Sequence, residues 1–157
     1  MKIVKKYFLF PILILAAGCG APPPIEINVE QAKHLGDQVA LDYFDNDSRD
    51  LYPKLDLGFK SKIHKESDLK EVLSHIRFLY GTPTAYDYKI ATYGHRAMES
   101  GSKSYVDLWY ILRTSQYPKG DHYLKIEVMQ AEGTTALLDV AGLGVLNFPD
   151  GLPSYLK

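Results

Sequence analysis

The sequence has little cysteine, little tryptophan and little net charge. One cysteine and one tryptophan occur among 157 residues, and the formal net charge is −1. A single cysteine excludes a disulfide framework within the chain, so a folded domain must be held together by its core alone. The lack of excess positive charge argues against the basic face that nucleic-acid-binding proteins use, and no nucleic-acid partner is expected.

The N-terminal hydrophobic run is too short for a membrane span. It covers residues 7–15, whereas a spanning helix needs ~20 apolar residues. Lys2, Lys5 and Lys6 precede the run, and small residues follow it. This order of charged, apolar and small residues is typical of a secretory signal. The sequence therefore predicts export rather than a spanning helix.

The residues around the only cysteine form a short motif. Ala16, Ala17 and Gly18 stand directly before Cys19, and they resemble the lipobox of bacterial lipoproteins, with alanine where that motif usually has leucine. The resemblance implies that residues 1–18 are a lipoprotein signal peptide. It also implies that Cys19 is a lipidation site, which attaches the chain to a membrane through diacylglycerol and fatty acids such as palmitate. The alternative is an ordinary cleaved signal in which Cys19 has no special part.

Residues 19–27 are the predicted lipidated tether. Its three consecutive prolines, Pro22, Pro23 and Pro24, favour an extended spacer that lets a folded domain stand away from a bilayer. Removal of residues 1–18 would take away three lysines and no acid, so the formal charge would fall from −1 to −4 and 139 residues would remain. That length suits the single α+β domain expected at residues 28–157.

The first half of this domain has helical periodicity. Apolar residues recur at three- and four-residue steps after Asn28, which predicts a helix that begins at this N-cap and ends at Phe44. A short second helical piece is expected from Leu51 to Phe59. A third helix is predicted with Ser67 as its cap and Gly81 at its end. Its apolar stripe comprises Leu69, Val72, Leu73, Ile76, Leu79 and Tyr80.

The period then changes from 3.6 to 2, and β-branched and aromatic residues become frequent. Strands are predicted at residues 84–93, 104–114, 121–131 and 136–148, with turn sequences such as HRAMESGSK between them. Connections this short favour an antiparallel meander, because parallel strands need long crossovers. The predicted fold class is α+β, in which N-terminal helices pack on a curved four-stranded antiparallel sheet.

This order of elements, the long first helix and the sequence LYGTP before the first strand resemble the nuclear-transport-factor-two-like group of the cystatin-like superfamily. The resemblance covers residues 29–148. It implies a cystatin-like cone with a pocket between sheet and helices, which in some relatives is an active site and in many is a core or a binding cleft.

Three tyrosines are candidates to line such a pocket. Tyr86 and Tyr88 are expected on one strand face together with Ile90, and Tyr110 lies on the apolar face of the next strand. The relatives that isomerise or dehydrate small molecules combine a tyrosine with an acid or base in the cone. Tyrosines with one satisfied hydroxyl are also ordinary core residues. The pattern places no acid firmly inside, and Asp107 alternates onto the opposite face.

The opposite face of the second strand carries Tyr105, Trp109 and Ile111. Aromatic residues on an otherwise outer face indicate a surface for a partner. The alternative is that helices or the C-terminal residues 148–157 cover these side chains. The sequence leaves both readings open.

The remaining motifs predict no catalytic residue, metal ligand or cofactor. Ser100 and Lys103 match an S-x-x-K pattern, but they fall in a predicted turn without the companion motifs. The G-x-G of Gly142 and Gly144 lies in a strand, where it favours a bulge or a close backbone approach. The five histidines never occur at the i, i+4 spacing of a zinc site.

Together these features favour an exported, lipid-anchored binding or interaction domain without enzymatic activity. We expect it in the cell envelope, on the periplasmic side of the outer membrane of a Gram-negative host, and otherwise on the outer face of the cell membrane. Its partner would be an envelope protein or a second copy. One alternative is a small-molecule-binding or isomerase- or dehydratase-like activity in the cone pocket. Another is an inhibitor or immunity-type protein of the envelope.

Overall fold

The computed structural model describes residues 27–98, 101–130, 138–148, 150 and 153–154 and confirms the α+β class. Helices come first: α1 (Val29–Asp45), α2 (Ser48–Leu51), the 3-10 turn η1 (Tyr52–Lys54), α3 (Leu57–Lys60) and α4 (Glu66–Tyr80). The strands β1 (Pro83–Met98), β2 (Gly101–Thr114), β3 (His122–Gln130) and β4 (Leu138–Asn147) follow. They form one antiparallel sheet in the order β1-β2-β3-β4.

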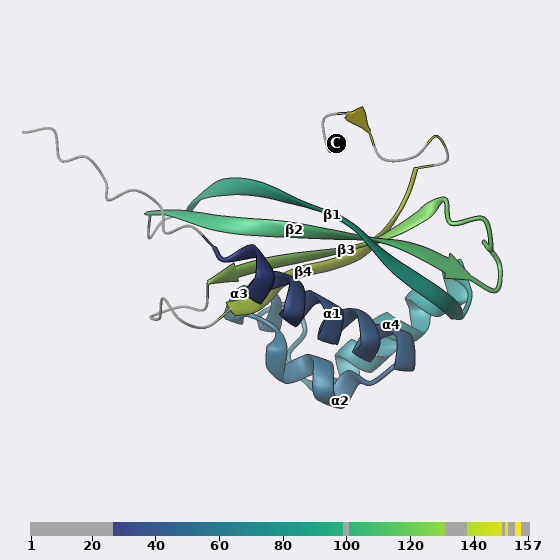
Figure 1. The fold of residues 1–157 in the computed structure, drawn as a ribbon. Helices are drawn as coiled ribbons and strands as arrows, with labels where there is room; N and C mark the ends of the chain where they lie inside the picture. Colours follow the sequence, from purple (N-terminus) through teal and green to yellow (C-terminus); the bar gives the residue numbers. More distant parts are fainter. Residues whose placement is uncertain (1–26, 99–100, 131–137, 149, 151–152, 155–157) are drawn as a thin grey trace, which may run out of the picture.

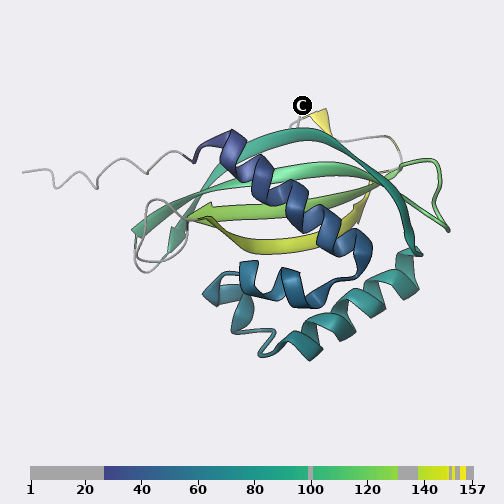
Figure 2. The same ribbon diagram turned by 60° about the horizontal axis from the view of Figure 1, so that its bottom comes forward.

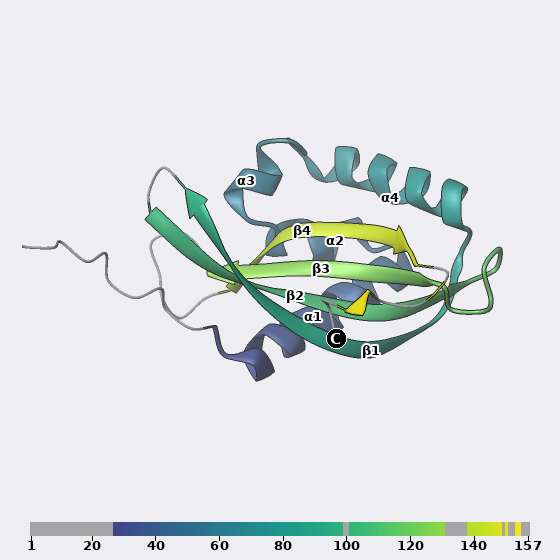
Figure 3. The same cartoon turned by 90° about the horizontal axis from the view of Figure 1, so that it is seen from above.

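The helices and the C-terminal residues lie on opposite sides of the curved sheet. Figure 1 shows the helices below the sheet and the described C-terminal residues above it. In Figure 2, α1 crosses the sheet diagonally, and α4 lies further out beside α2. Seen from above in Figure 3, β1 and β4 are the two border strands. We call the helix-covered side the inner face and the other side the outer face.

The ends of α1 have clear local causes. The Asn28 side chain accepts a hydrogen bond from the Gln31 backbone N–H at 3.1 Å, which confirms the predicted N-cap. The helix ends at Asp45, one residue beyond the prediction, because Asn46 adopts a left-handed conformation (φ 61°) that terminates it. Arg77 of α4 donates to the carbonyl oxygens of Tyr43 and Phe44, which joins the ends of the two helices.

The start and the apolar stripe of α4 differ from the prediction. The helix begins at Glu66, before Ser67, and its N-cap residue Lys65 makes no side-chain cap. Leu69 and Leu73 are buried, whereas Val72 and Leu79 are exposed. The buried stripe is narrower than predicted because α4 packs against α2 rather than across the sheet.

The β1–β2 hairpin is longer than predicted. Pairing continues to Arg96 opposite Lys103 and Met98 opposite Gly101, in residues that were expected to form a turn. One cause is visible at Gly94, which faces Tyr105 across the strand pair. A Cβ atom at position 94 would lie 2.2 Å from the Tyr105 ring, so the aromatic side chain covers the glycine backbone.

A β-bulge in β1 changes which side chains share a face. The register shifts between Tyr88, which pairs with Tyr110, and Ile90, which pairs with Trp109. Lys89 is the extra residue, so the alternation of faces is interrupted there. The prediction that Ile90 lies on the same face as Tyr86 and Tyr88 is therefore wrong, and Ile90 packs on the outer face.

The core fills the space between the sheet and α1. Inner-face apolar side chains of β2, β3 and β4 are at most 1% exposed; they are Val106, Leu108, Tyr110, Leu112, Leu124, Ile126, Val128 and Val140. Gly36 lets α1 approach them closely, because a Cβ atom there would lie 2.2 Å from Leu108 Cδ1 and 2.7 Å from the Tyr110 hydroxyl. The predicted alternation of β2 and β3 is confirmed.

Candidate functional site

The three tyrosines predicted to line a pocket lie together on the inner face. Their rings meet edge to face, with centroids 5.6 Å apart for Tyr88 and Tyr110 and 6.1 Å apart for Tyr86 and Tyr110. Phe44 of α1 packs against Tyr86 at 5.8 Å. This clustering follows from register, because Tyr88 stands directly opposite Tyr110 in the strand pair.

Polar groups of α1 complete this tyrosine cluster. The Tyr110 hydroxyl donates to Asp37 Oδ1 at 2.9 Å, and Lys33 Nζ lies 2.6 Å from Asp37 Oδ2. The same ammonium group lies 4.9 Å from the centre of the Tyr88 ring. Burial raises the pKa of Tyr110, and its hydrogen bond to Asp37 adds to this effect. Tyr110 is thus a neutral hydrogen-bond donor in the working pH range.

The tyrosine cluster is a packed wall rather than an open site. Tyr110 is fully buried against α1, and its one hydroxyl is satisfied. Only Tyr88 among the three is exposed, with 37% of its surface accessible. A substrate would therefore meet the Tyr88 ring and the Lys33 ammonium, but not the hydroxyl of Tyr110. The arrangement supplies packing and one buried hydrogen bond, which is the work of a core.

On the outer face, the predicted interface residues differ in exposure. Trp109 is 4% exposed, whereas Tyr105 and Ile111 are partly exposed. The Phe148 ring lies 6.1 Å from Trp109 and 5.8 Å from Tyr123, and the indole N–H donates to Thr92 Oγ1 at 3.2 Å. A partner on this face would therefore contact Tyr105 and Ile111 directly and would reach Trp109 only if Phe148 moved.

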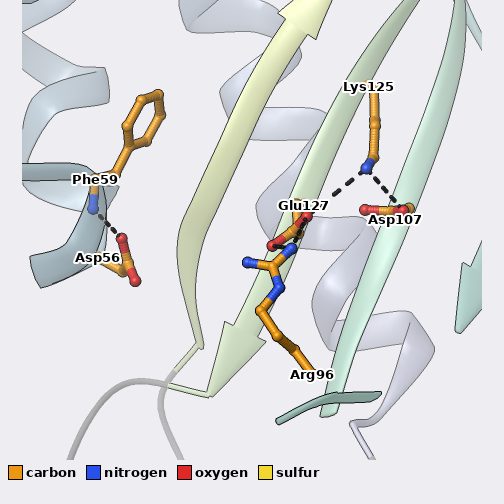
Figure 4. Close-up of polar contacts among 6 residues, drawn as sticks. All are labelled: Asp56, Phe59, Arg96, Asp107, Lys125 and Glu127. Carbon is orange, nitrogen blue, oxygen red and sulfur yellow. Dashed lines mark hydrogen bonds and ion pairs between the residues drawn. The ribbon is translucent and has the colours of Figure 1, made fainter. Parts of the chain in front are cut away.

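Beside this aromatic group lies a cluster of four charged side chains, which we call the charged quartet: Arg96, Asp107, Lys125 and Glu127. Lys125 Nζ lies 2.9 Å from Asp107 Oδ2 and 3.7 Å from Glu127 Oε2. Arg96 Nη2 lies 2.8 Å from Glu127 Oε1. Figure 4 shows the two carboxylates between Lys125 on one side and Arg96 on the other. The quartet is electrically neutral.

The acids of the quartet are buried although they belong to the outer face. The side chains of Asp107 and Glu127 are only 11% and 8% exposed. Burial raises the pKa of Asp107, and the hydrogen bond and charge of Lys125 act against this increase. Asp107 Oδ1 has no hydrogen-bond partner among the described residues. The prediction that Asp107 lies on the face opposite the apolar residues of β2 is confirmed, and the acid is buried there.

Aromatic rings shield the cations of the quartet. Lys125 Nζ lies 5.7 Å from the centre of the Trp109 ring, and the Arg96 guanidinium lies 5.3 Å from that of Tyr105. At these distances each cation is attracted to the face of the ring. The same contacts connect the charged quartet with Tyr105 and Trp109. The charged and aromatic side chains therefore form one continuous surface across β1, β2 and β3.

A hollow of about 240 Å³ adjoins the quartet at the border strand. It is lined by Lys125, Glu127 and the stretch from Gly142 to Leu146 of β4. Gly142 stands opposite Glu127 and Gly144 opposite Lys125, so the walls are charged and the floor is bare backbone. A Cβ atom at Gly144 would meet no other atom within 4 Å. Gly142 also follows a bulge in β4, which confirms the predicted irregularity at this G-x-G.

The hollow is small for a metabolite site. Pockets for small ligands typically enclose about 300–1,000 Å³. A bare backbone floor suits the close approach of another chain or of one inserted side chain. The same face that carries the charged quartet therefore offers a place for one side chain of a partner.

A different part of the helical layer also positions a carboxylate. Asp56 caps α3 by accepting a hydrogen bond from the Phe59 backbone N–H at 2.6 Å, as Figure 4 also shows. Its own backbone N–H donates to the Val140 carbonyl at 2.9 Å. This contact fastens the helical layer to the border strand, next to the hollow.

The sequence interpretation missed the charged quartet. Its signal was present, because Asp107 and Glu127 each stand between two inward-facing apolar residues on neighbouring strands and therefore share the outer face. The relative register of the strands was needed to bring them to opposed positions, Asp107 directly beside Glu127. Of the other predicted features, Cys19 and Ser100 lie outside the described residues.

Among the described residues, no three histidine, cysteine, aspartate or glutamate side chains gather as ligands for a metal ion. In the same part of the chain, none of the helices has the length and apolar character needed to cross a bilayer. Comparison with models of protein families, with curated proteins and with solved structures finds no match for this chain. The fold and the site define an α+β domain with a packed inner face and a charged, glycine-floored hollow on its outer face.

Proposed function

We propose that this chain is a lipid-anchored protein of the cell envelope whose domain binds other macromolecules and does not transform a small molecule. The packed inner face carries the proposal. In the resembling folds, chemistry takes place between helix and sheet, and here that space holds fully buried apolar side chains and the satisfied hydroxyl of Tyr110.

The outer face supports the binding part of the proposal. It combines partly exposed Tyr105 and Ile111, the charged quartet and the hollow over Gly142 and Gly144. Aromatic groups with a polar surround are typical of protein interfaces. The expected partner is an envelope protein, as in the inhibitor or immunity-type alternative, or a second copy of the chain.

The anchor rests on the sequence before the domain. The lipobox-like residues 16–18, Cys19 and the proline spacer support attachment to a membrane. Gly20 after the cysteine favours the outer membrane in a Gram-negative host, by resemblance to sorting in such bacteria. We further propose that the curved sheet with its covering helix is a cystatin-like cone, which the observed element order supports.

The anchor is tested by growing a bacterial host that expresses the chain with an alkyne-tagged fatty acid and then measuring the label on the purified protein. We expect a strong signal from the parent, because Cys19 would carry the acyl groups. The Cys19→Ala variant should lose at least nine-tenths of it.

A second variant, Cys19→Ala with Ile25→Cys, is the matched control. It retains one cysteine six residues further along, and it should stay unlabelled because three prolines, and not the small residues of the motif, then precede the thiol. Equal labelling of the parent and the Cys19→Ala protein would refute the anchor.

A further inference from the structure

The border of the sheet at β4 has a stretch that is open to another strand. Phe148 N donates to Asp121 O at 3.0 Å, and every second residue of an antiparallel strand bonds to the same neighbour. The backbone groups of Gly144 and Leu146 therefore face β3, and those of Leu143 and Val145 point away from the sheet. Within the described residues, no backbone partner lies on that side of Leu143 or Val145.

Both ends of this open stretch are closed by the chain itself. At one end, Leu55 forms a parallel bridge with Val140, and Asp56 N donates to Val140 O. At the other end, the chain leaves the border at Phe148, which packs over Trp109. The open stretch thus runs from position 141 to position 147, and its centre is Gly144.

Because the open stretch of β4 has two defined ends, it can pair symmetrically with the same stretch of a second copy in one register only. If a second copy aligns its β4 antiparallel to the first, with Gly144 opposite Gly144, then Leu146 of each copy stands opposite Gly142 of the other. Residues that stand opposite each other in a sheet point to the same face. Leu146 and Gly142 both lie on the outer face, where the hollow is. Leu146 is 38% exposed, and Gly142 is part of the hollow's bare floor.

We infer that the open stretch of β4 is a self-association edge at which two copies of this chain join their sheets. In this arrangement, the Leu146 side chain of each copy enters the hollow of the other and packs on Gly142 and the carbon stems of Lys125 and Glu127. The backbone groups of Leu143 pair with those of Val145 in the other copy. The contact has a twofold axis at Gly144, as closed dimers require.

The self-complementary spacing favours a second copy over an unrelated strand. The apolar side chain and the bare backbone that would receive it lie at equal distances along the strand from one residue, Gly144. A contact along a stretch this short buries less surface area than a standard protein–protein interface, in which the two partners together bury about 1,600 Å². The dimer is therefore weak and reversible. The inference goes beyond the proposed function and does not depend on the anchor.

Charge substitutions at the twofold axis test the inference. Gly144→Lys and Gly144→Glu each place like charges directly opposite each other in the dimer, which destabilises a strand pair. In the single chain, a Cβ atom at position 144 would meet no other atom within 4 Å. Because position 144 stands opposite Lys125, a lysine there faces a like charge within its own chain and a glutamate faces an opposite one, so the two variants together separate this effect from the effect on the dimer. The measurement is sedimentation velocity of the full chain in a density-matched mild detergent, from about 1 to 500 μM.

We expect the parent to show a reversible monomer–dimer equilibrium and each charged variant to dimerise at least tenfold more weakly. A 1:1 mixture of the Lys and Glu variants should recover dimerisation to within about threefold of the parent, because opposite charges then meet. Thr84→Lys on the other border strand, β1, is the matched control and should behave as the parent. Urea unfolding of each variant checks that it folds.

A parent that stays monomeric throughout this range would overturn the inference. Dimerisation of the charged variants with the strength of the parent would overturn it too, since the axis would then lie elsewhere. A mixture that fails to recover while both variants are folded would exclude Gly144 as the point where the copies meet. None of these outcomes bears on labelling at Cys19, so the proposed anchor is judged separately.

Discussion

At the scale of the residue, Asp107 is an acid whose position is costly to ionise. Its side chain is mostly buried, Lys125 bonds to one oxygen, and the other oxygen has no partner among the described residues. Its neighbour Glu127 contacts two cations, Arg96 and Lys125. One oxygen of each acid, Asp107 Oδ1 and Glu127 Oε1, has no hydrogen-bond partner among the described residues, but Glu127 contacts two cations and Asp107 only one. Burial raises the pKa of Asp107, and we expect its protonation to respond to folding.

We expect the Asp107→Asn variant to change the pH dependence of stability. Burial raises the pKa of Asp107 above its ordinary value of 3.8, so between 3.8 and the raised pKa the folded chain holds this proton more tightly than the unfolded chain. The free energy of unfolding of the parent should therefore fall as pH rises through that interval, by up to ~1.4 kcal/mol per pH unit. Urea unfolding from pH 3.5 to 7 measures this.

The variant should lack that decrease, because asparagine does not titrate. Asp139, whose pKa burial also raises, is present in both proteins, so its effect cancels in the difference. Parallel pH profiles for parent and variant would show that Asp107 titrates alike in the folded and unfolded chains.

The same scale shows what the sequence could and could not predict. The alternation of β2 placed Val106, Leu108 and Tyr110 on the inner face correctly. The bulge at Lys89 was not predicted, because lysine is neither a glycine nor another residue that marks a bulge in a sequence. It moved Ile90 to the outer face. The strand itself was predicted correctly, and one extra residue made the assignment of its faces wrong.

At the scale of the element, the fit of α1 against the sheet depends on one missing side chain. Gly36 is a helical residue that costs the isolated helix about 1 kcal/mol relative to alanine. The helix tolerates this cost because Leu108 and the Tyr110 hydroxyl occupy the space where a Cβ atom would stand. The next residue of the helix, Asp37, accepts the hydrogen bond from the Tyr110 hydroxyl.

We expect Gly36→Ala to destabilise the domain by about 2 kcal/mol, since overpacking of a tight core typically costs 1–3 kcal/mol and exceeds the gain in helix propensity. Thermal unfolding followed by circular dichroism measures it. Gly144→Ala is the control, because the added methyl group meets no atom within 4 Å. A Gly36→Ala protein as stable as the parent would mean that α1 can move away from β2 at little cost.

Elements were predicted better than the contacts between them. The first helix, predicted to end at Phe44 and observed to end at Asp45, and its cap at Asn28 follow from local physics and were found. The exposure of Val72 and Leu79 was not predicted. An apolar stripe indicates that a helix packs against another element, but it does not show how much of the stripe that element covers. The charged quartet depends in the same way on the register between β2 and β3, which no single strand specifies.

At the scale of the whole molecule, the two faces of the sheet differ in the side chains that they carry. The inner face is closed by α1 and by side chains that are at most 1% exposed. The outer face carries the quartet and the hollow. The sequence left open whether the space between the helices and the sheet is a pocket or a filled core, because both occur among the cone-shaped domains that it resembles. The volume of a core depends on side-chain packing, which residue order does not reveal.

We expect the folded chain to contain no small molecule in its core. Native mass spectrometry of protein isolated from its expression host should give masses of the protein alone, apart from any lipid on Cys19. A non-covalently bound metabolite that is released on denaturation would contradict the packed inner face and favour the isomerase- or dehydratase-like alternative. Refolding from urea followed by a second spectrum is the control, because it removes molecules that were trapped during expression.

The order of the strands has a consequence for how the chain folds. Strand order in space equals strand order in sequence, so each strand pairs with the one that precedes it in the chain. Loops between neighbours are short, and little chain entropy is lost in closing them. The bridge between Leu55 and Val140 is different, since it joins the helical layer to the last strand. The sheet can therefore grow hairpin by hairpin while α1 packs on its first strands, and the bridge between Leu55 and Val140 must wait until nearly the whole chain is available.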